Sequence, residues 1–420
     1  MTGSLSHAFR QRGRGHVTAG RVLDECTWDG HKSDMTLHDP DLRPVQGAAF
    51  LPNEGEAGGI VTIDLAAIEA NWKLLASMTL PVECAAVVKA NAYGCGLELV
   101  TRKLAKAGCR TFFVAEMMEA RSVRAIAPTA TIYVLGGMMP GQAQAFCEGS
   151  FRPVINSLTE LAEWDAFVTQ TGWRGGAALH VDTGMNRLGV TVQEAIAVAP
   201  RAQSENHGFT LLMSHLACAE TPDHPMNDRQ IRAFREIRIM FRGISSSLAN
   251  SSGIFLGGTV FCDLVRPGIA IYGANPTPGK KNPMRPAVEL KGRIVQVRTI
   301  ERGATVGYGA SWTAARPSRI AIVAVGYADG FLRSAGASKN KPAAHVVIAG
   351  RRCPIVGRVS MDLLAIDVTD LAEGTARRGD FAVLIGDGVT VDDLAEGMGT
   401  ISYEVLSTLG HRYHRIYRGA

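Results

Sequence analysis

Short apolar runs, separated by amphipathic helical stretches, constrain the fold of this chain more than any other feature. The runs recur about every 25 residues, and each is continuously apolar, as parallel strands buried on both faces are. Helical patterns such as 97–107, 158–168 and 228–241 lie between them. Eight strands alternating with helices predict an α/β fold, the (β/α)8 TIM barrel. The expected strands are Cys84–Val88, Thr111–Val114, Thr131–Leu135, Pro153–Ile155, Ala178–Val181, Thr210–Met213, Gly253–Leu256 and Leu264–Ile271.

The pattern differs on either side of this stretch. Ile60–Ile63 is predicted to be a strand, and Asp64 is placed to cap a following helix with one apolar face. After about residue 286, strands separated by Gly-rich turns dominate, with one helix at 392–398, which predicts a C-terminal mostly-β domain. The strands expected there are Val288–Ile300, Ile320–Val325, His345–Ile348, Leu363–Val368 and Phe381–Ile385.

Three parts follow from these patterns. Residues 1–58 lack apolar periodicity and are expected to be a disordered N-terminal extension, with Met35 as a second candidate start. Residues 59–289 are expected to form the barrel, and residues 290–420 the β domain. The length of 420 residues then holds two folded domains and a tail rather than three domains.

Composition narrows the function classes. The 44 basic and 39 acidic residues give a net charge of +5, too balanced to call for nucleic acid or an anionic membrane as a partner. No apolar stretch is long enough to span a membrane, and the N-terminus does not resemble a signal peptide. The eight cysteines form no CxxC pair or ligand-like cluster, so we expect reduced thiols, a cytoplasmic protein and no metal site.

The segment Ala86-Val-Val-Lys89-Ala-Asn91-Ala-Tyr93-Gly-Cys-Gly96 is the most informative one for chemistry. It places Lys89 at the carboxyl end of a barrel strand, where the active sites of this fold lie. A lysine in an apolar mouth loses hydration, and the neutral amine can form a Schiff base, most often with pyridoxal phosphate. A solvated lysine at a strand end explains this segment equally well.

Four further segments fall at the ends of expected strands. Two of them carry Arg187 and His215, in Asp182-Thr-Gly-Met-Asn-Arg187 and Ser214-His215. The others are Asn250-Ser-Ser-Gly253, which suits a phosphate, and Arg266-Pro-Gly268 at the last barrel strand. Each is weak alone, since Arg187 could form a surface ion pair and His215 could be a packed histidine. Their shared placement favours one site.

The segment around Lys89 resembles the pyridoxal-phosphate signature of the alanine racemase family. The resemblance runs from about residue 60 to 417 and includes the Asp182–Arg187 and Arg266–Gly268 segments. It extends into the β domain through Val306-Gly-Tyr308-Gly-Ala310 and Gly357-Arg-Val-Ser-Met361-Asp362. Matches in both domains, in the family's order, make the resemblance specific.

The resemblance implies a two-base mechanism in a homodimer. Lys89 would hold the cofactor as an aldimine and act as one base, and Tyr308 of the other subunit would act as the second. Racemisation needs bases on opposite faces of one carbon, so that the proton lost from one face is replaced on the other. A phenol is a poor base at neutral pH and needs cationic or donor neighbours, for which His215 is the candidate.

The resemblance also assigns binding residues. Arg266 would face the pyridine nitrogen and, because it keeps its charge, would leave that nitrogen unprotonated. Arg187 would reach the substrate carboxylate and the cofactor's phenolic oxygen, and the Met361 N–H would reach the same carboxylate. The phosphate would be bound by Tyr93, Ser251, Gly268 and Ile269, and the channel would be lined by Tyr327, Arg333 and Glu220.

This chain departs from the family pattern at several positions. His180 stands where many members carry a carbamylated lysine, so another group must orient Arg187. His411 stands where a phosphate-contacting tyrosine is common and Tyr413 lies close by, which leaves that contact open. Glu220 replaces an aspartate often found at the channel and is one methylene longer.

The expected function is an alanine racemase that interconverts L-alanine and D-alanine and supplies D-alanine for peptidoglycan. The alternatives are a racemase of broader or different specificity, for example for serine or lysine, and a decarboxylase of the same architecture. Tyr308 in Gly-Tyr-Gly argues against the decarboxylase. A non-enzymatic cofactor-binding barrel protein is a further alternative, but such proteins lack the β domain.

Overall fold

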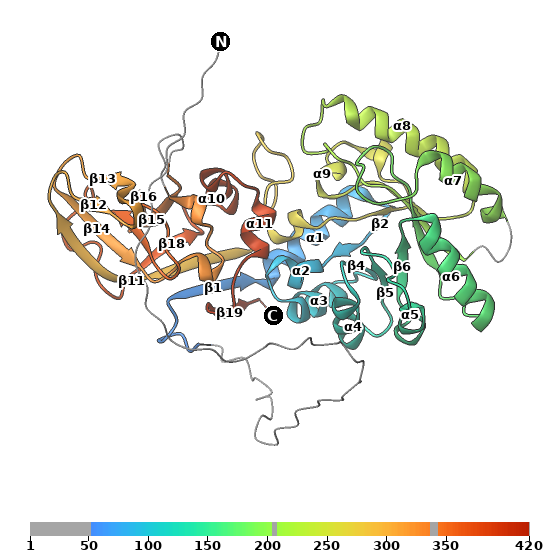
Figure 1. The fold of residues 1–420 in the computed structure, drawn as a ribbon, viewed down its shortest axis with the longest axis horizontal. Helices are drawn as coiled ribbons and strands as arrows, with labels where there is room; N and C mark the ends of the chain where they lie inside the picture. The colour runs from blue at the N-terminus through green and yellow to red at the C-terminus, as the bar shows by residue number, and fades with distance from the viewer. Residues whose placement is uncertain (1–51, 204–207, 337–342, 420) are drawn as a thin grey trace, which may run out of the picture. The chain divides into compact units, whose positions relative to one another are not determined.

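The structure is a computed structural model, and it describes residues 52–203, 208–336 and 343–419. Figure 1 shows the arrangement of the elements. The expected disordered extension spans residues 1–58, of which residues 1–51, with Met35, lie outside the described residues. Residues 52–58 are ordered, contrary to that expectation, because they pack on the second sheet: Ala57 is buried, and Gly58 O accepts from Arg293 N at 2.8 Å. The described residues belong to one compact unit.

The expected parallel barrel is confirmed. Strands β3 to β9 form a seven-stranded parallel sheet in sequential order. Strand β10 pairs with β2 on one side, and on the other Arg266 N donates to Ala249 O at 2.9 Å, which closes the cylinder. The strands are β2 Glu83–Cys84, β3 Ala86–Val87, β4 Thr111–Val114, β5 Thr131–Val134, β6 Arg152–Ile155, β7 Ala177–His180, β8 Phe209–Met213, β9 Ser246–Ser247 and β10 Leu264–Val265.

The expected seventh strand at Gly253–Leu256 is wrong. Residues Ser251–Ile254 form the short helix α9, and the seventh strand is β9, Ser246–Ser247. Sequence periodicity misses β9 because two serines carry no apolar signal. Their hydroxyls are bonded inside the barrel wall, Ser246 Oγ to Asp263 Oδ2 at 2.7 Å and Ser247 Oγ to Leu264 O at 2.5 Å. The expected strand Leu264–Ile271 also ends early, at Val265, and is followed by the 3-10 helix η3, Ile269–Tyr272.

Helices surround the barrel where amphipathic patterns predict them. Asp64 caps the first one by accepting a hydrogen bond from Ala67 N at 2.8 Å, as its position before the apolar face predicts. Ser157 caps α6 in the same way, accepting from Glu160 N at 3.1 Å. The helices are α1 Leu65–Thr79, α2 Lys89–Tyr93, α3 Leu97–Lys106, α4 Met117–Ile126, α5 Ala143–Gly149, α6 Leu158–Thr171, α7 Val192–Val198 and α8 Pro225–Met240.

The C-terminal half is built on one mainly antiparallel sheet that curls into a ring. Its order is β14-β17-β16-β15-β18-β11-β1-β19, and a further pairing of β14 with β11 closes six of the strands on themselves. The elements are β11 Val288–Ile300, β12 Thr305–Val306, η4 Tyr308–Ala310, β13 Trp312–Thr313, β14 Ser318–Val323, η5 Tyr327–Asp329, η6 Arg333–Ala335, β15 His345–Ile348, β16 Arg351–Val356, β17 Leu364–Asp367, β18 Phe381–Ile385, α10 Val391–Met398, α11 Ser402–Ser407 and β19 His414–Arg418.

Strand β1, Gly59–Asp64, belongs to this second sheet rather than to the barrel. It pairs with β11 in antiparallel fashion and with β19 in parallel fashion. One continuous apolar core includes Val61 on β1, Val88 at the barrel and Ile366 on β17. Helix α11 reaches the barrel side, where the ring of Tyr403 lies 6.0 Å from that of Tyr93.

Candidate active site

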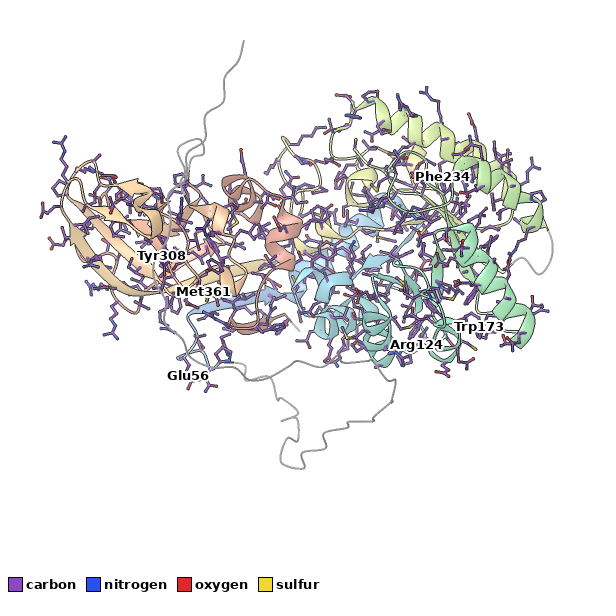
Figure 2. All side chains as sticks on the ribbon, in the orientation of Figure 1. Glu56, Arg124, Trp173, Phe234, Tyr308 and Met361 are labelled. Atoms are coloured by element: carbon purple, nitrogen blue, oxygen red, sulfur yellow. The ribbon has the colours of Figure 1, made fainter. Side chains whose placement is uncertain are left out.

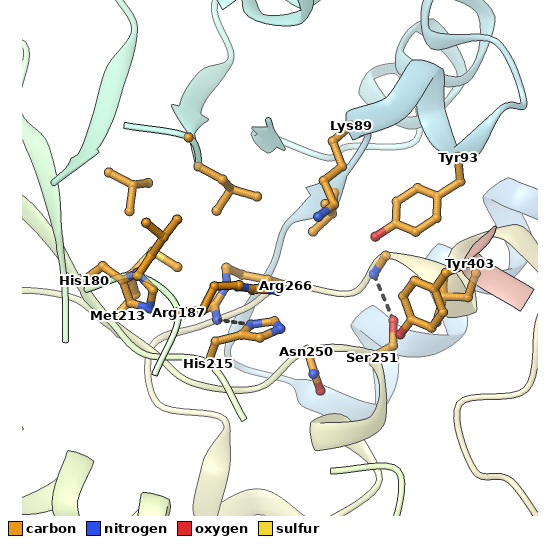
Figure 3. A pocket seen from close by; sticks show the side chains of 17 residues that line it. Lys89, Tyr93, His180, Arg187, Met213, His215, Asn250, Ser251, Arg266 and Tyr403 are labelled. Carbon is orange, nitrogen blue, oxygen red and sulfur yellow. Dashed lines mark hydrogen bonds between the residues drawn. The ribbon is translucent and has the colours of Figure 1, made fainter. Parts of the chain in front are cut away.

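A cavity of about 380 Å³ opens at the carboxyl ends of the barrel strands. Eight residues expected at the site from sequence line it together, and Figure 3 shows most of their side chains facing one another. They are Lys89, Tyr93, Arg187, His215, Ser251, Arg266, Gly268 and Ile269. Polar and charged side chains therefore meet in one cavity, although they come from strand ends that span 180 residues of the sequence.

Lys89 stands at the start of α2, directly after the first barrel strand, and is half-buried. Burial lowers the pKa of its ammonium, and the Arg187 guanidinium lowers it further, while the Glu119 carboxylate opposes both effects. The result is an amine that loses its proton more readily than a solvated lysine does. The position and environment of Lys89 therefore favour a reactive amine over a solvated lysine at a strand end.

One corner of the cavity is shaped for an anion. Ser251 Oγ accepts hydrogen bonds from Gly268 N at 2.9 Å and Ala270 N at 3.3 Å, so the amides of this turn converge there. Gly268 is required by close approach, because a Cβ at that position would lie 2.3 Å from the Tyr93 hydroxyl oxygen. Tyr93 is itself held by stacking on Tyr272, with ring centroids 4.6 Å apart.

Arg266 forms part of the cavity wall and is only 3% exposed. Its guanidinium donates to Ser214 O at 2.6 Å, to the Ser247 hydroxyl and to His215 Nδ1 at 3.4 Å. Burial lowers its pKa to about 10, which still leaves it charged at neutral pH. Burial, with help from Arg266, lowers the pKa of His215 to about 3. Because a guanidinium only donates, His215 Nδ1 is the acceptor and its proton is on Nε2.

His180, at the end of β7, also lines the cavity. Its Nδ1 lies 2.8 Å from Asn156 Oδ1, while Asn156 Nδ2 donates to Val154 O at 2.7 Å. That pattern makes His180 Nδ1 the donor and leaves Nε2 as the acceptor nitrogen. Burial first, then Arg266, lowers the pKa of His180 to about 4. His180 is therefore a neutral imidazole at neutral pH.

Arg187 is carried by a loop that Asp182 organises. The Asp182 carboxylate accepts from Gly184 N at 2.8 Å, Met185 N at 2.9 Å and Asn186 N at 2.9 Å. Asn186 has φ 56°, a left-handed conformation that such a tight turn requires. The Asp-Thr-Gly-Met-Asn segment thus fixes the backbone that presents Arg187 to the cavity.

Five expected site residues do not line this cavity: Tyr308, Met361, Tyr327, Arg333 and Glu220. Tyr308 is 71% exposed on η4 and Met361 is 53% exposed, and Figure 2 shows both within the β half. Tyr327 and Arg333 are likewise absent from the cavity wall. The backbone holds Tyr327 and Met361 close together, because the amide of Ala328, the residue after Tyr327, donates to Met361 O at 2.9 Å. Tyr308 borders a second hollow of about 470 Å³.

Tyr403 is a cavity residue that sequence reasoning missed. It lies on α11, lines the wall beside Tyr93, and has its pKa raised to about 12 by burial and by the charge of Glu220. His411 is exposed and Tyr413 is 1% exposed, and neither lines the cavity. The Thr-Ile-Ser-Tyr-Glu sequence around Tyr403 has no periodicity or glycine turn that marks it, so only the packing of α11 against α2 reveals it.

Comparisons with known proteins identify this arrangement. Residues 63–276 match the family described as alanine racemase, N-terminal domain, and residues 287–417 match the alanine racemase, C-terminal domain. The chain belongs to the alanine racemase family. An alanine racemase of Methylobacterium sp. (strain 4-46) is 49% identical over 360 residues, which are 86% of this chain and 98% of that protein. An alanine racemase of Rhizobium meliloti is 45% identical over 370 residues, 86% of this chain and 97% of that one.

Solved structures of alanine racemases have the same fold. The enzyme of Bartonella henselae, solved with covalently bound pyridoxal phosphate, has a TM-score of 0.81 and 37% identity, covering 86% of this chain and 99% of that one. The biosynthetic enzyme of Pseudomonas aeruginosa has a TM-score of 0.80 and 34% identity, covering 86% and 100%. Family membership makes this chain a pyridoxal-phosphate-dependent racemase.

The cavity of this alanine racemase family member fits pyridoxal phosphate. It offers a lysine for the aldehyde, a buried guanidinium for the ring and a glycine turn whose amides suit a phosphate. A side chain at Gly268 would fill the corner that the phosphate needs. In the part of the chain that the structure describes, no helix is long and apolar enough to cross a membrane.

Proposed function

We propose that this cavity racemises alanine, with Lys89 as the attachment point of the cofactor and one of two bases, and Tyr308 of a second copy of the chain as the other. The alanine substrate follows from the family and from similar proteins that are named alanine racemase. One observation supports these residue roles best: Lys89, Arg266, Ser251 and Gly268 line the same cavity.

Pyridoxal phosphate, when bound, withdraws electrons from the α-carbon of the amino acid joined to it and so makes the α-proton removable. Lys89 is suited to take or return that proton, because burial and Arg187 lower the pKa of its amine. Arg266 stays charged and donates only, so it cannot pass a proton to the ring nitrogen. Return of the proton to the α-carbon is thereby favoured over transamination.

The second base is proposed to come from another subunit. Tyr308 and Met361 are exposed and lie outside the cavity of their own chain, yet racemisation needs a base opposite Lys89. We therefore infer a homodimer in which the β domain, from about residue 290 onward, completes the neighbour's site. Tyr327 and Arg333 would line the channel from the same side, and Glu220, beside Tyr403, would line it from the barrel.

Substrate binding is assigned to Arg187 and Met361. The Arg187 guanidinium, held on the loop that Asp182 organises, is placed to bind the substrate carboxylate, and the Met361 amide would donate to the same group. Tyr93, Ser251, Gly268 and Ile269, joined by Tyr403, would hold the phosphate. His215 and His180 would stay neutral beside Arg266 and Arg187.

We further propose a cytoplasmic enzyme that supplies D-alanine for peptidoglycan. The test is to incubate the purified protein with L-alanine, L-serine or L-lysine and to measure each D-isomer. D-alanine as the main product supports the proposal, whereas D-serine or D-lysine without D-alanine would establish the alternative specificity. Borohydride reduction followed by peptide mapping should place the cofactor on Lys89, and a label on another lysine would refute the assignment.

A further inference from the structure

The turn that follows Lys89 has an unusual backbone. Ala90, Asn91, Ala92 and Tyr93 have φ between 52° and 54°, so four consecutive residues with side chains are left-handed. L-residues avoid this region because Cβ approaches the next carbonyl oxygen. Such a backbone persists only where its surroundings hold it, and such segments cluster at functional sites. This one joins two cavity residues, Lys89 and Tyr93.

Hydrogen bonds inside the turn hold its far end. Asn91 Oδ1 accepts from Leu97 N at 2.8 Å, and Gly96 N donates to Asn91 O at 2.9 Å. These bonds fix the exit into α3. They do not involve the peptide group between Lys89 and Ala90. The orientation of that peptide group sets the direction of the Lys89 side chain.

Glu119 on α4 binds that peptide. Its Oε1 accepts from Ala90 N at 2.6 Å, and its Oε2 accepts from Ala115 N at 2.8 Å and Glu116 N at 3.3 Å. One carboxylate thus ties the residue after Lys89 to the segment that follows β4. Both of its oxygens are used, and a charged acceptor makes each bond stronger than a neutral one would.

Glu119 is also the anion that acts on Lys89. Among the described residues, Lys89 interacts electrostatically with Arg187 on the loop after β7, Glu119 on α4 and His215 after β8. His215 is neutral, since burial lowers its pKa to about 3. Arg187 disfavours a positive charge on the Lys89 nitrogen, and Glu119 favours it.

We propose that Glu119 is a positioning residue for Lys89, holding the left-handed turn through the Ala90 amide and supplying the negative charge that balances Arg187. This inference rests on the proposed role of Lys89 as the attachment point of pyridoxal phosphate. The charge keeps the lysine nitrogen available in its protonated form during catalysis, while the hydrogen bond sets its direction.

A matched control exists in the same barrel. Glu160 on α6 makes an equivalent tie, with Oε2 accepting from Asn156 N at 2.7 Å and Oε1 from Met138 N at 2.5 Å. Like Glu119, it is the third residue of its helix, and it bridges two consecutive strand ends. It borders a different cavity from Lys89. Glu160→Gln therefore removes the same kind of tie without removing the charge next to Lys89.

The experiment compares E119Q, E119D and E160Q in the full-length holoenzyme. The pH midpoint of the cofactor's visible absorbance reports the protonation of the Lys89 nitrogen. We expect E119Q to lower this midpoint by about half a pH unit or more, because a stabilising charge is lost. We expect kcat to fall by about tenfold with little change in KM. E160Q should lower thermal stability and leave the midpoint unchanged.

Glu119→Asp separates the two effects. It keeps the charge but withdraws it from the Ala90 amide, so the midpoint should stay near the wild-type value while kcat falls about fivefold. If E119Q does not fold, a wild-type kcat in E119D overturns the proposal. If E119Q and E160Q both keep the wild-type pH midpoint of absorbance and lose the same amount of stability, Glu119 acts only as a helix cap and the proposal is refuted. A borohydride label on another lysine in the wild-type protein would instead refute the role of Lys89.

Discussion

Arg266 donates a hydrogen bond to Nδ1 of His215 at 3.4 Å, and both side chains line the wall of the cavity. The bond fixes the imidazole as a neutral ring with its proton on Nε2, and the arginine remains the charged partner. Two residues of ambiguous meaning in the sequence, a strand-end arginine and a strand-end histidine, thereby become one polar unit with a defined protonation state.

The charge of Arg266 should control which reaction the site performs. In Arg266→Glu, a carboxyl group that can protonate the ring nitrogen replaces a guanidinium that cannot, so racemisation should slow and transamination should rise. D-alanine and pyruvate formation are measured in parallel on the same preparation. An unchanged ratio of the two products would contradict the proposed role.

Shared active sites predict complementation between two inactive variants. Lys89→Ala and Tyr308→Phe should each lose at least about a thousandfold in kcat as homodimers. A mixed dimer should regain activity, because one of its sites combines the intact Lys89 of one chain with the intact Tyr308 of the other. Activity is assayed after co-expression with two different affinity tags and tandem purification. A mixed dimer as inactive as its parents would place both residues in the same chain's site.

Gly268 should be essential for cofactor binding rather than for folding. In Gly268→Ala the new Cβ would lie 2.3 Å from the Tyr93 hydroxyl oxygen, and Tyr93 is held against Tyr272, so the phosphate corner must distort. We expect the affinity for pyridoxal phosphate, measured by absorbance titration, to fall by about tenfold or more. Gly258→Ala is the control, since nothing lies within 4 Å of a Cβ there. Equal affinities for pyridoxal phosphate in the two variants would argue against a phosphate site at Gly268.

The two neutral, partly buried histidines of the cavity wall should make stability depend on pH. Burial lowers the pKa of His215 to about 3 and that of His180 to about 4, so below about pH 6.5 the unfolded chain binds more protons than the folded one. Their contribution is complete above that pH and is lost as the pH falls. At pH 5 the loss relative to pH 7 is about 2 kcal/mol for each histidine.

Urea unfolding at pH 7 and pH 5 measures this loss. His180→Gln should lose about 2 kcal/mol less than the wild-type protein between the two pH values, because one of the two histidines no longer titrates. Replacing the exposed His345 by Gln is the control and should leave the difference as it is in the wild-type protein. A difference unaffected by His180→Gln would show that this histidine does not titrate on unfolding.

The barrel and its strand ends followed from sequence because their signal is local. Thr111–Val114 and His345–Ile348 have the same bounds in the structure as in the prediction, since a buried run of β-branched and aromatic residues between turns has few other solutions. The pattern failed at Ser246–Ser247, where the strand is formed by two serines whose hydroxyls bond to neighbours far along the chain. Small polar strands carry no periodic signal.

Sequence alone determined which residues carry the proposed chemistry: a lysine after an apolar strand, a glycine turn, and an arginine, in the order of the alanine racemase family. Only the tertiary structure decided that Tyr403 lines the cavity, that β1 belongs to the second sheet, and that Glu119 holds the peptide after Lys89. The reason is physical. Residue type and local period specify what a side chain can do, whereas its neighbours are set by the packing of segments that are distant in the chain.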